Sequence, residues 1–312
     1  MANLKLGLRR ATTAALNLVP APFVRYLLKS YYYEPRLQNR IRYHIQPFRF
    51  DTPIPDVSEI DRDQLPRKRH LSGIPSTSSG YHALLDRLQP YAAEIHGLPQ
   101  MDDGKSQFWF RNGGYEDFDA VTLYSMIRHL KPRRMIEVGC GYSSRLTTMA
   151  ALKNRAEGSP MECLFVEPHP SEHLLKFQLA GPLRVEKIQK TPLEEIAKLR
   201  SGDILFIDTS HVLKTQNDLC RILHEILPTL AGGVYVHFHD IFTPFEYPED
   251  WLLKISFHFN EQYALEAVLC NSDRFEVILP VHALWREDLK KLSELLPSGS
   301  KQGAAFWIRK KG

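Results

Sequence analysis

The stretch of residues 134–149, RMIEVGCGYSSRLTTM, constrains the fold more than any other part of the chain. Met135–Val138 is a short apolar run, typical of a buried strand, and Ser144–Asn154 has the composition of a helix. Between them, Gly139 and Gly141 let the backbone turn sharply and approach a ligand, because neither residue carries a Cβ. The pattern predicts a strand, a glycine turn and a helix whose free N–H groups point at a ligand.

Strand-like and helix-like segments alternate from about residue 115 onward. This alternation predicts an α/β fold with a doubly wound, mostly parallel, seven-stranded Rossmann-like sheet and helices on both faces. The last strand is expected to run antiparallel. The expected strands are Met135–Val138, Cys163–Val166, Leu183–Ile188, Asp203–Asp208, Gly232–Asp240, Phe275–Pro280 and Ala304–Lys310. The expected helices are Asp119–His129, Ser144–Asn154, Ser171–Gln178, Leu193–Leu199, Asn217–Leu227, Trp251–Cys270 and Glu287–Leu296.

The N-terminal part has a different character. We expect residues 1–114 to form a basic arm and a mostly helical or irregular cap, and residues 115–312 to form the domain that holds the sheet. The first 50 residues carry nine Lys or Arg against one acidic residue, a balance of +8 in a chain whose total is +4. One interpretation is a solvated or packed arm, and the alternative is peripheral contact with an anionic membrane surface. A nucleic-acid partner is not expected.

Several protein classes are excluded by simple counts. No window approaches the roughly 20 apolar residues of a membrane span. The apolar run Ala14–Val24 is interrupted by Asn17, Pro20 and Pro22, and no small-residue cleavage site follows it, so it makes a poor signal peptide. The four cysteines form no C-x-x-C pair, which leaves no disulfide framework or zinc motif. We therefore expect a cytoplasmic protein.

The glycine turn restricts which nucleotide can bind. Ser144 occupies the position of the third glycine in the dinucleotide fingerprint G-x-G-x-x-G, and no phosphate-binding P-loop motif is present. Glu137, two residues before Gly139, would repel a pyrophosphate but suits a cationic ligand such as S-adenosylmethionine (SAM). Glu167 ends the next strand, where its carboxylate could accept both ribose hydroxyls of either nucleotide. A SAM site is favoured, and an NAD site remains the alternative.

Four motifs in order resemble the class I SAM-dependent methyltransferases, and more closely the bacterial branch called methyltransferase domain family 24. They are IEVGCGYSS, the acid Glu167, DILFIDTSH and LAGGVYVHFHDIF, and PFEYPEDW follows them. The resemblance covers roughly residues 118–312, and the chain departs from the commonest glycine motif at Ser143. It implies a SAM cofactor, and we predict that the residues binding it are Glu137, Gly139, Gly141, Ser143, Glu167 and Asp208.

Polar side chains follow two later strands, as Asp208-Thr-Ser-His211 and His237-Phe-His239-Asp240. Because the ends of parallel strands meet at one edge of the sheet, these side chains are expected to converge. In one interpretation Asp208, His239 and Asp240 bind a divalent cation, Mg²⁺ or Mn²⁺, that activates a hydroxyl. In the other, His211 or His239 acts as a general base without a metal, and Asp208 orients it.

The sequence thus predicts a SAM-dependent O-methyltransferase whose acceptor is a hydroxyl on a sugar or another small metabolite, the acceptor class being implied by the resemblance alone. The predicted catalytic residues are Asp208, His211 and His239. Two other functions remain open: an NAD-dependent oxidoreductase of related fold, and a scaffold docked through the basic N-terminus. The sequence does not indicate an oligomeric state.

Overall fold

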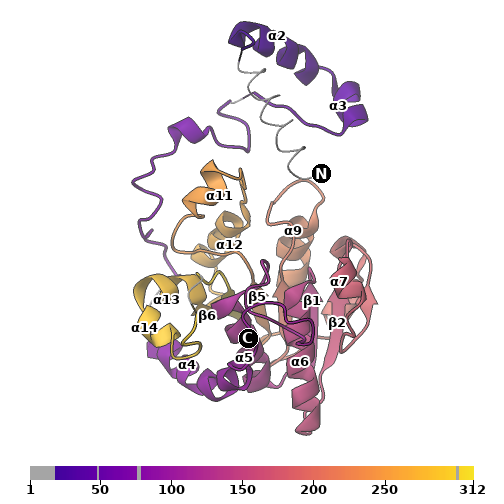
Figure 1. The fold of residues 1–312 in the computed structure, drawn as a ribbon, viewed down its shortest axis with the longest axis vertical. Coiled ribbons are helices and arrows are strands. Elements are labelled where there is room, and N and C mark those ends of the chain that lie inside the picture. The colour runs from indigo at the N-terminus through magenta and orange to yellow at the C-terminus, as the bar shows by residue number, and fades with distance from the viewer. Residues whose placement is uncertain (1–17, 48, 76–78, 300–301) are drawn as a thin grey trace. The chain divides into compact units, whose positions relative to one another are not determined.

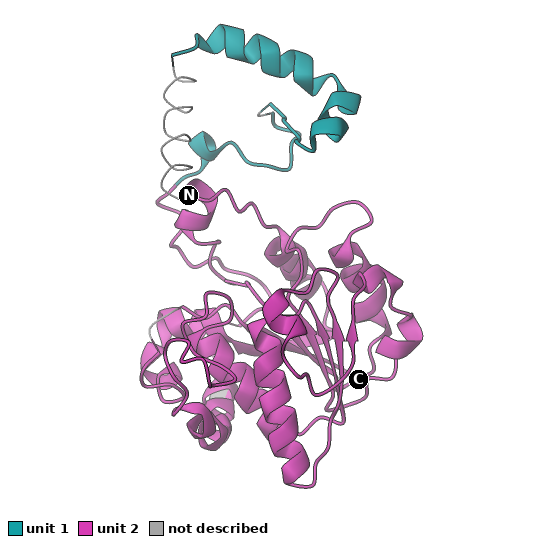
Figure 2. Ribbon diagram, turned by 45° about the vertical axis from the view of Figure 1, so that its right-hand side comes forward, with its two compact units in different colours: residues 1–61 teal, residues 62–312 magenta. Residues whose placement is uncertain are grey.

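The structure is a computed structural model that describes residues 18–47, 49–75, 79–299 and 302–312. Two compact units are distinguished, residues 1–61 and residues 62–312 (Figure 2). The predicted boundary at residue 114 falls inside the second unit, where helix α4 (Ser79–Ala92) packs on helix α5 (Asp117–Leu130). The division into a cap of residues 1–114 and a domain of residues 115–312 therefore stays a prediction.

A single sheet of seven strands runs through the second unit (Figure 1), in the order β3-β2-β1-β4-β5-β7-β6. The strands are β1 (Arg134–Val138), β2 (Glu162–Val166), β3 (Leu183–Arg184), β4 (Ile204–Ile207), β5 (Tyr235–Phe238), β6 (Phe275–Pro280) and β7 (Phe306–Lys310). Strands β1 to β5 pair in parallel, while β7 is antiparallel to both of its neighbours, β5 and β6. The predicted doubly wound α/β fold is confirmed.

Alternation along the strands divides the core into two layers. In β4, Ile204 and Phe206 pack into the cluster that includes α4, α5 and α6 (Tyr142–Ala156). Leu205 and Ile207 pack on the opposite face, against the helical run of residues 218–229 and against α12 (Glu261–Cys270). Successive strand side chains point to opposite faces, so both faces of this sheet need helical cover, as the apolar strands predict.

The helices differ from the predictions in detail. The remaining elements of the second unit are η2 (Ala93–Ile95), α7 (Glu172–Leu175), η3 (Ile188–Lys190), α8 (Leu193–Ile196), α9 (Asp218–Arg221), the π-helix η4 (Ile222–Ile226), α10 (Leu227–Thr229), α11 (Glu249–Leu253), α13 (Val281–Glu287) and α14 (Leu289–Leu292). The expected helix Trp251–Cys270 is broken between α11 and α12, where Ser256 has a φ of +56°. The expected helix Glu287–Leu296 is found in part, as the short helix α14, and the sequence analysis missed α13, which begins directly after β6.

The first unit contains helix α2 (Ala21–Tyr32), helix α3 (Pro35–Ile41) and the 3₁₀ turn η1 (Val57–Glu59). Gln38 fastens the two helices, since its amide nitrogen donates to the carbonyls of Tyr31 and Tyr32 at 3.3 and 2.8 Å. Three of the nine basic residues of the predicted arm, Lys5, Arg9 and Arg10, lie outside the described residues. Among the residues that are described, no helix is long and apolar enough to cross a membrane.

Candidate functional site

The turn after β1 is tight and needs a glycine. Gly139 has a φ of +82°, and a Cβ placed on it would lie 1.6 Å from the carbonyl oxygen of Asp208. Its N–H donates to the carbonyl of Val166 at 2.9 Å. The turn is therefore held between the ends of β2 and β4, and the absence of a side chain lets the three strand ends meet.

Glu137 lies behind the turn. Its carboxylate is fully buried and accepts hydrogen bonds from three hydroxyls of α6: Ser143 at 2.8 Å, Ser144 at 2.6 Å and Thr147 at 2.7 Å. Burial raises its pKa to about 7, although the three hydroxyls act in the opposite direction. This carboxylate anchors the start of α6 to β1.

Neither Glu137 nor Ser143 lines the cavity beside the turn, and their predicted contact with a cofactor stays a prediction. Ser144 replaces the third glycine of the dinucleotide fingerprint for a structural reason. Its hydroxyl donates to Glu137 and accepts the N–H of Gly141 at 3.1 Å. Glu137, the acid that favoured SAM over NAD in the sequence, is thus bonded to α6 in this structure.

A cavity of about 420 Å³ opens at the carboxyl ends of β1, β2 and β4. Glu167 lies in it, with one carboxylate oxygen accepting the N–H of Cys140 at 3.1 Å and the other accepting the N–H of His169 at 2.6 Å. Two backbone donors thus fix the carboxylate at the predicted position. The lining residues are Val138, Gly139, Val166, Glu167, Pro168, His169, Lys187, Ile188, Gln189, Asp208, Thr209, Ser210, Lys214, Asn217 and Asp218. Gly141 is not among them, and its missing side chain faces open space.

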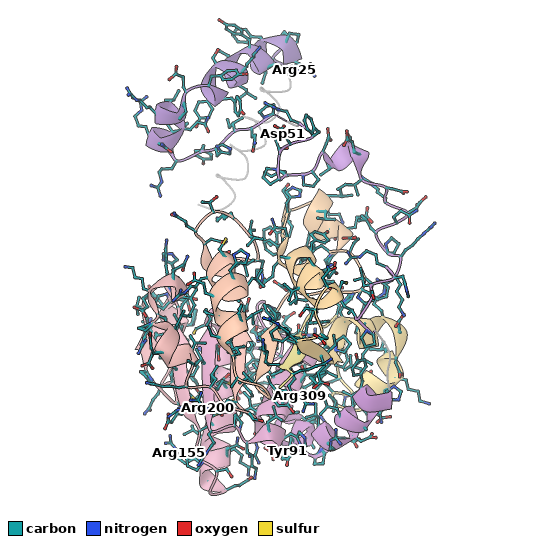
Figure 3. The ribbon with its side chains drawn as sticks, turned by 180° about the vertical axis from the view of Figure 1, so that it is seen from behind. Arg25, Asp51, Tyr91, Arg155, Arg200 and Arg309 are labelled. Carbon is teal, nitrogen blue, oxygen red and sulfur yellow. The ribbon has the colours of Figure 1, made fainter. Side chains whose placement is uncertain are left out.

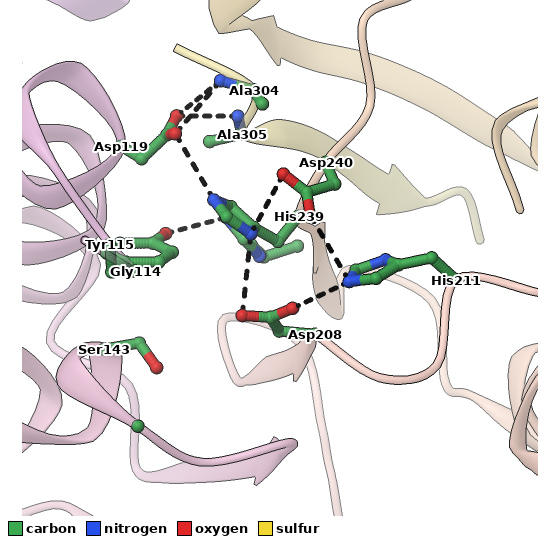
Figure 4. A network of polar contacts seen from close by, with 12 residues as sticks. Gly114, Tyr115, Asp119, Ser143, Asp208, His211, His239, Asp240, Ala304 and Ala305 are labelled. Carbon is green, nitrogen blue, oxygen red and sulfur yellow. Dashed lines mark hydrogen bonds and ion pairs between the residues drawn. The ribbon is translucent and has the colours of Figure 1, made fainter. Parts of the chain in front are cut away.

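Two aspartates and two histidines close a ring beside this cavity (Figure 4). His211 Nε2 lies 3.2 Å from Asp208 and 3.4 Å from Asp240. His239 Nδ1 lies 3.5 Å from each of the same two carboxylates. The structure therefore brings together four of the residues predicted to converge, and Asp208 belongs both to the ring and to the cavity wall. His237, which was predicted to converge with them, has no ion pair with either aspartate of the ring and lies 3.0 Å from the hydroxyl of Tyr115 instead.

Each histidine is held from behind by a carboxylate that the sequence analysis missed. Glu261 of α12 accepts from His211 Nδ1 at 2.8 Å, and Asp119 of α5 lies 3.3 Å from His239 Nε2. Asp119 also accepts the backbone N–H groups of Ala304 and Ala305 at 2.8 and 2.7 Å. Both acids lie on helices. A search for polar residues at strand ends cannot find them, because their position depends on how the helices pack.

The charges of the cluster favour protonated imidazoles. Burial alone would lower the pKa of His211, but its bonds to Asp208 and Glu261 outweigh burial and raise the pKa well above its ordinary value. Burial is likewise outweighed at His239, whose pKa is raised by Asp240 and Asp208. Among the aspartates, burial raises the pKa of Asp240, whereas the two imidazoles overcome burial at Asp208 and hold its pKa far below the usual range.

Two residues of the ring have strained backbones. His211 has a φ of +56° and Asp240 a φ of +57°. Residues other than glycine rarely adopt this left-handed backbone conformation. Such strain costs on the order of 1 kcal/mol or more at each position and persists only when the surroundings impose it. Two of the four ring residues therefore have a strained backbone.

The donor types of the ring suit a divalent cation, because two carboxylates and an imidazole are ligands that Mn²⁺ accepts. Their spacing, however, is that of ion pairs. Within the part of the chain that the structure describes, no three His, Cys, Asp or Glu side chains are arranged to hold a metal ion. The metal set Asp208, His239 and Asp240 therefore stays a prediction.

The neighbouring aromatic side chains are packed into the protein. His237 is fully buried and stacks on Phe206, with the two ring centroids 4.3 Å apart. Its Nε2 lies 3.0 Å from the hydroxyl oxygen of Tyr115. Burial keeps its pKa well below the ordinary value, as expected for a neutral core histidine. In the loop of residues 243–251, Phe245 and Tyr247 are also buried, so they fill the core and do not offer a free stacking surface.

The comparison with protein families covers this same region. Residues 136–241 match the family model described as Methyltransferase domain, family 24. This segment is similar to a methyltransferase domain. The matched segment runs from β1 to just beyond β5 and contains every predicted site residue, so the resemblance inferred from the motifs is confirmed. Asp119 and Glu261, which hold the two histidines, lie on either side of the matched methyltransferase segment.

One curated relative is an uncharacterized protein of Archaeoglobus fulgidus, 26% identical over 135 residues. The match covers 41% of this chain and 60% of that protein. Among solved structures, the apo form of CmcI-N160 is 14% identical, with 88% of this chain and 99% of that chain covered and a TM-score of 0.40. The apo form of CalS11, a TDP-rhamnose 3'-O-methyltransferase of calicheamicin biosynthesis, is 16% identical, with 75% and 95% covered and a TM-score of 0.39.

Proposed function

We propose that the protein is a SAM-dependent methyltransferase that methylates a hydroxyl group on a sugar or another small metabolite. The observation that carries the proposal is the double position of Asp208, which lines the cavity next to Glu167 and also belongs to the ring of His211, His239 and Asp240. A cofactor in the cavity and an acceptor at the ring would meet at this residue. The match to a methyltransferase domain supports the cofactor.

The cavity offers a binding site for the cofactor. Glu167, fixed by two backbone N–H groups, would accept the ribose hydroxyls, and Gly139 leaves room beside the strand ends. When bound, SAM supplies an electrophilic methyl group. The chain's own part is to place the acceptor oxygen in line with that methyl group and to take the proton that the oxygen loses.

The pKa directions assign different parts to the two aspartates. Asp208 has a strongly lowered pKa and stays anionic beside the imidazoles, so it suits hydrogen bonding and orientation. Asp240 has a raised pKa, which makes its carboxylate the better proton acceptor of the two. A general-base role for His211 or His239 would require that imidazole to lose its proton first, because a cationic imidazole can only donate.

A divalent cation at the ring, held by Asp208, His239 and Asp240, remains part of the proposal. Bound there, it would stabilise the ionised form of an acceptor hydroxyl. Its binding can be measured without any acceptor, by titrating the protein with Mn²⁺ in a calorimeter. Binding that is lost in Asp240→Asn would support the site, and an absence of binding to the wild type would remove the metal from the proposal.

Cofactor binding is tested by titrating the full chain with S-adenosylhomocysteine and, separately, with NAD⁺. We expect micromolar affinity for the first ligand alone, weakened at least about tenfold in Glu167→Ala through loss of two ribose hydrogen bonds. Glu162→Ala, on the same strand but at its exposed start, is the matched control. Binding of NAD⁺ instead would favour the oxidoreductase, and binding of neither ligand by folded protein would favour the scaffold.

A further inference from the structure

The first unit has almost no interior of its own. Among its described residues, 18–47 and 49–61, Gln38 is the one buried side chain, and no hydrophobic side chain is buried. Large apolar side chains are exposed instead. They are Leu18, Phe23, Tyr26, Leu27, Leu28, Tyr33, Ile41, Tyr43, Phe50, Ile54 and Val57. Helices of this length are marginal without tertiary packing, so an apolar surface that covers them is needed.

Helix α2 presents this apolar surface on one side. Phe23, Val24, Leu27, Leu28 and Tyr31 follow the spacing i, i+1, i+4, i+5 and i+8, which places them along one face of the helix. Phe23 and Leu27 are 55% and 52% exposed. The other face of α2 carries Arg25, labelled in Figure 3, and Lys29, one helical turn further on.

The cations of this helix pair have no acidic partner in the described part of the chain. Arg25, Lys29, Arg36, Arg40 and Arg42 have no ion pair with any carboxylate among the residues that the structure describes. Glu34 is the one acidic residue in the first 50. A concentration of unpaired positive charge beside exposed apolar side chains complements a surface that is anionic outside and apolar beneath.

The α2–α3 pair nevertheless has a defined local structure. Besides donating to Tyr31 and Tyr32, Gln38 binds His44 Nδ1 through its side-chain oxygen at 2.8 Å. The hydroxyl of Tyr31 donates to the carbonyl of Tyr43 at 2.7 Å. These bonds fix the turn between the helices and the segment after α3, so the apolar face belongs to a helix with a defined local structure.

We propose that α2 lies in the interface of an anionic phospholipid bilayer, with its apolar face among the upper acyl chains and its basic residues on lipid phosphates. A second copy of the chain fits this surface less well, because it would cover the apolar face of α2 but offer no anions to the basic residues on the other face. Residues 1–17 contain Lys5, Arg9 and Arg10 and no acid, so they add to the positive charge and do not neutralise it. This inference does not depend on the proposed methyl transfer.

The test is co-sedimentation of the full chain with vesicles of phosphatidylcholine alone and of phosphatidylcholine mixed equally with phosphatidylglycerol. We expect binding to the mixed vesicles that weakens with added salt. Arg25→Glu/Lys29→Glu should bind at least about tenfold more weakly, since each basic residue near such a surface contributes roughly a fivefold factor. Leu27→Glu/Leu28→Glu should also lose binding. Leu152→Glu/Arg155→Glu, an exposed pair on α6, is the matched control.

A second readout follows contact directly, and it does not depend on loss of binding. Leu27→Trp should be quenched by brominated lipids in the mixed vesicles more strongly than Tyr26→Trp, which lies away from the centre of the apolar face. Equal quenching, or binding that both α2 variants retain, would overturn the proposal. If the protein does not bind vesicles but forms dimers as its concentration rises, the proposal is wrong and a second copy covers the apolar face. If it does not bind vesicles and stays monomeric, the proposal is wrong and another part of the same chain covers that face.

Discussion

At the scale of single residues, Glu137 makes the stability of the turn after β1 depend on pH. Its folded-state pKa of about 7 exceeds its ordinary value of 4.5, because the carboxyl is buried. A carboxyl whose pKa is raised on folding favours the folded state below its ordinary pKa, and it loses that contribution as pH rises through the raised value. Stability should therefore fall between about pH 4.5 and pH 7 because of this residue.

We expect Glu137→Gln to match the wild type in free energy of unfolding near pH 5, since the protonated acid and the amide have similar shapes. At pH 8 the variant should be more stable, by on the order of 3 kcal/mol for a shift of this size. Urea unfolding at both pH values measures the difference. A gap between the two proteins that does not change with pH would contradict the assignment.

Gly139 is the residue on which the turn depends most directly. In Gly139→Ala the new Cβ would collide with the carbonyl of Asp208, in addition to the strain of its positive φ. We expect destabilisation of about 2–4 kcal/mol and at least about tenfold weaker S-adenosylhomocysteine binding. Gly158→Ala is the control, because Gly158 has nearly the same φ but no atom within 4 Å of the added Cβ. Equal effects of the two substitutions would show that the close contact is unimportant.

The residues of the site divide into those that sequence can predict and those that it cannot. Asp208, His211, His239 and Asp240 follow adjacent parallel strands, and the geometry of a parallel sheet alone brings such residues together. Asp119 and Glu261 reach the same place from helices, whose position depends on side-chain packing in three dimensions. Glu137 was placed in the right motif, but its contacts with three hydroxyls depend on how α6 is seated.

At the scale of elements, the same contrast holds. The apolar runs predicted β1, β2 and β4 to within two residues at either end, because buried strands need continuous hydrophobic sequence. The helix expected over residues 251–270 fails at Ser256, and the run of residues 217–227 contains a π-helical turn. Such interruptions are imposed by the fit of the helices to the sheet and leave little trace in periodicity.

Arg128 joins three helical elements and should be important for stability. Its side chain is 1% exposed and contacts Glu94 of η2 at 2.9 Å and Glu157 after α6 at 2.6 Å. Because both acids keep partial contact with water, we expect Arg128→Met to cost about 2–4 kcal/mol, somewhat less than breaking a fully buried pair. Arg134→Met, which removes the exposed pair with Glu162, should cost less than about 1 kcal/mol. Denaturant midpoints of both variants measure the contrast.

At the scale of the whole molecule, the two units differ in how they are stabilised. Every hydrophobic side chain that is buried in the described chain belongs to residues 62–312. We therefore expect a protein of residues 62–312 to fold cooperatively and to bind S-adenosylhomocysteine within about twofold of the full chain, a difference well below 1 kcal/mol. Calorimetric titration of both proteins checks this. A large loss of affinity in folded truncated protein would show that the first unit contributes to the cofactor site.

The double position of Asp208 has a thermodynamic consequence. One of its carboxylate oxygens faces His211 and the other faces His239, while the same residue borders the cavity. A ligand in the cavity that moves or neutralises this carboxylate changes the environment of a ligand at the ring, and the reverse also holds. Linkage requires the effect to be reciprocal: the factor by which the cofactor product alters acceptor affinity must equal the factor by which the acceptor alters affinity for that product. The two substrates of such an enzyme would be cooperative ligands of a single side chain.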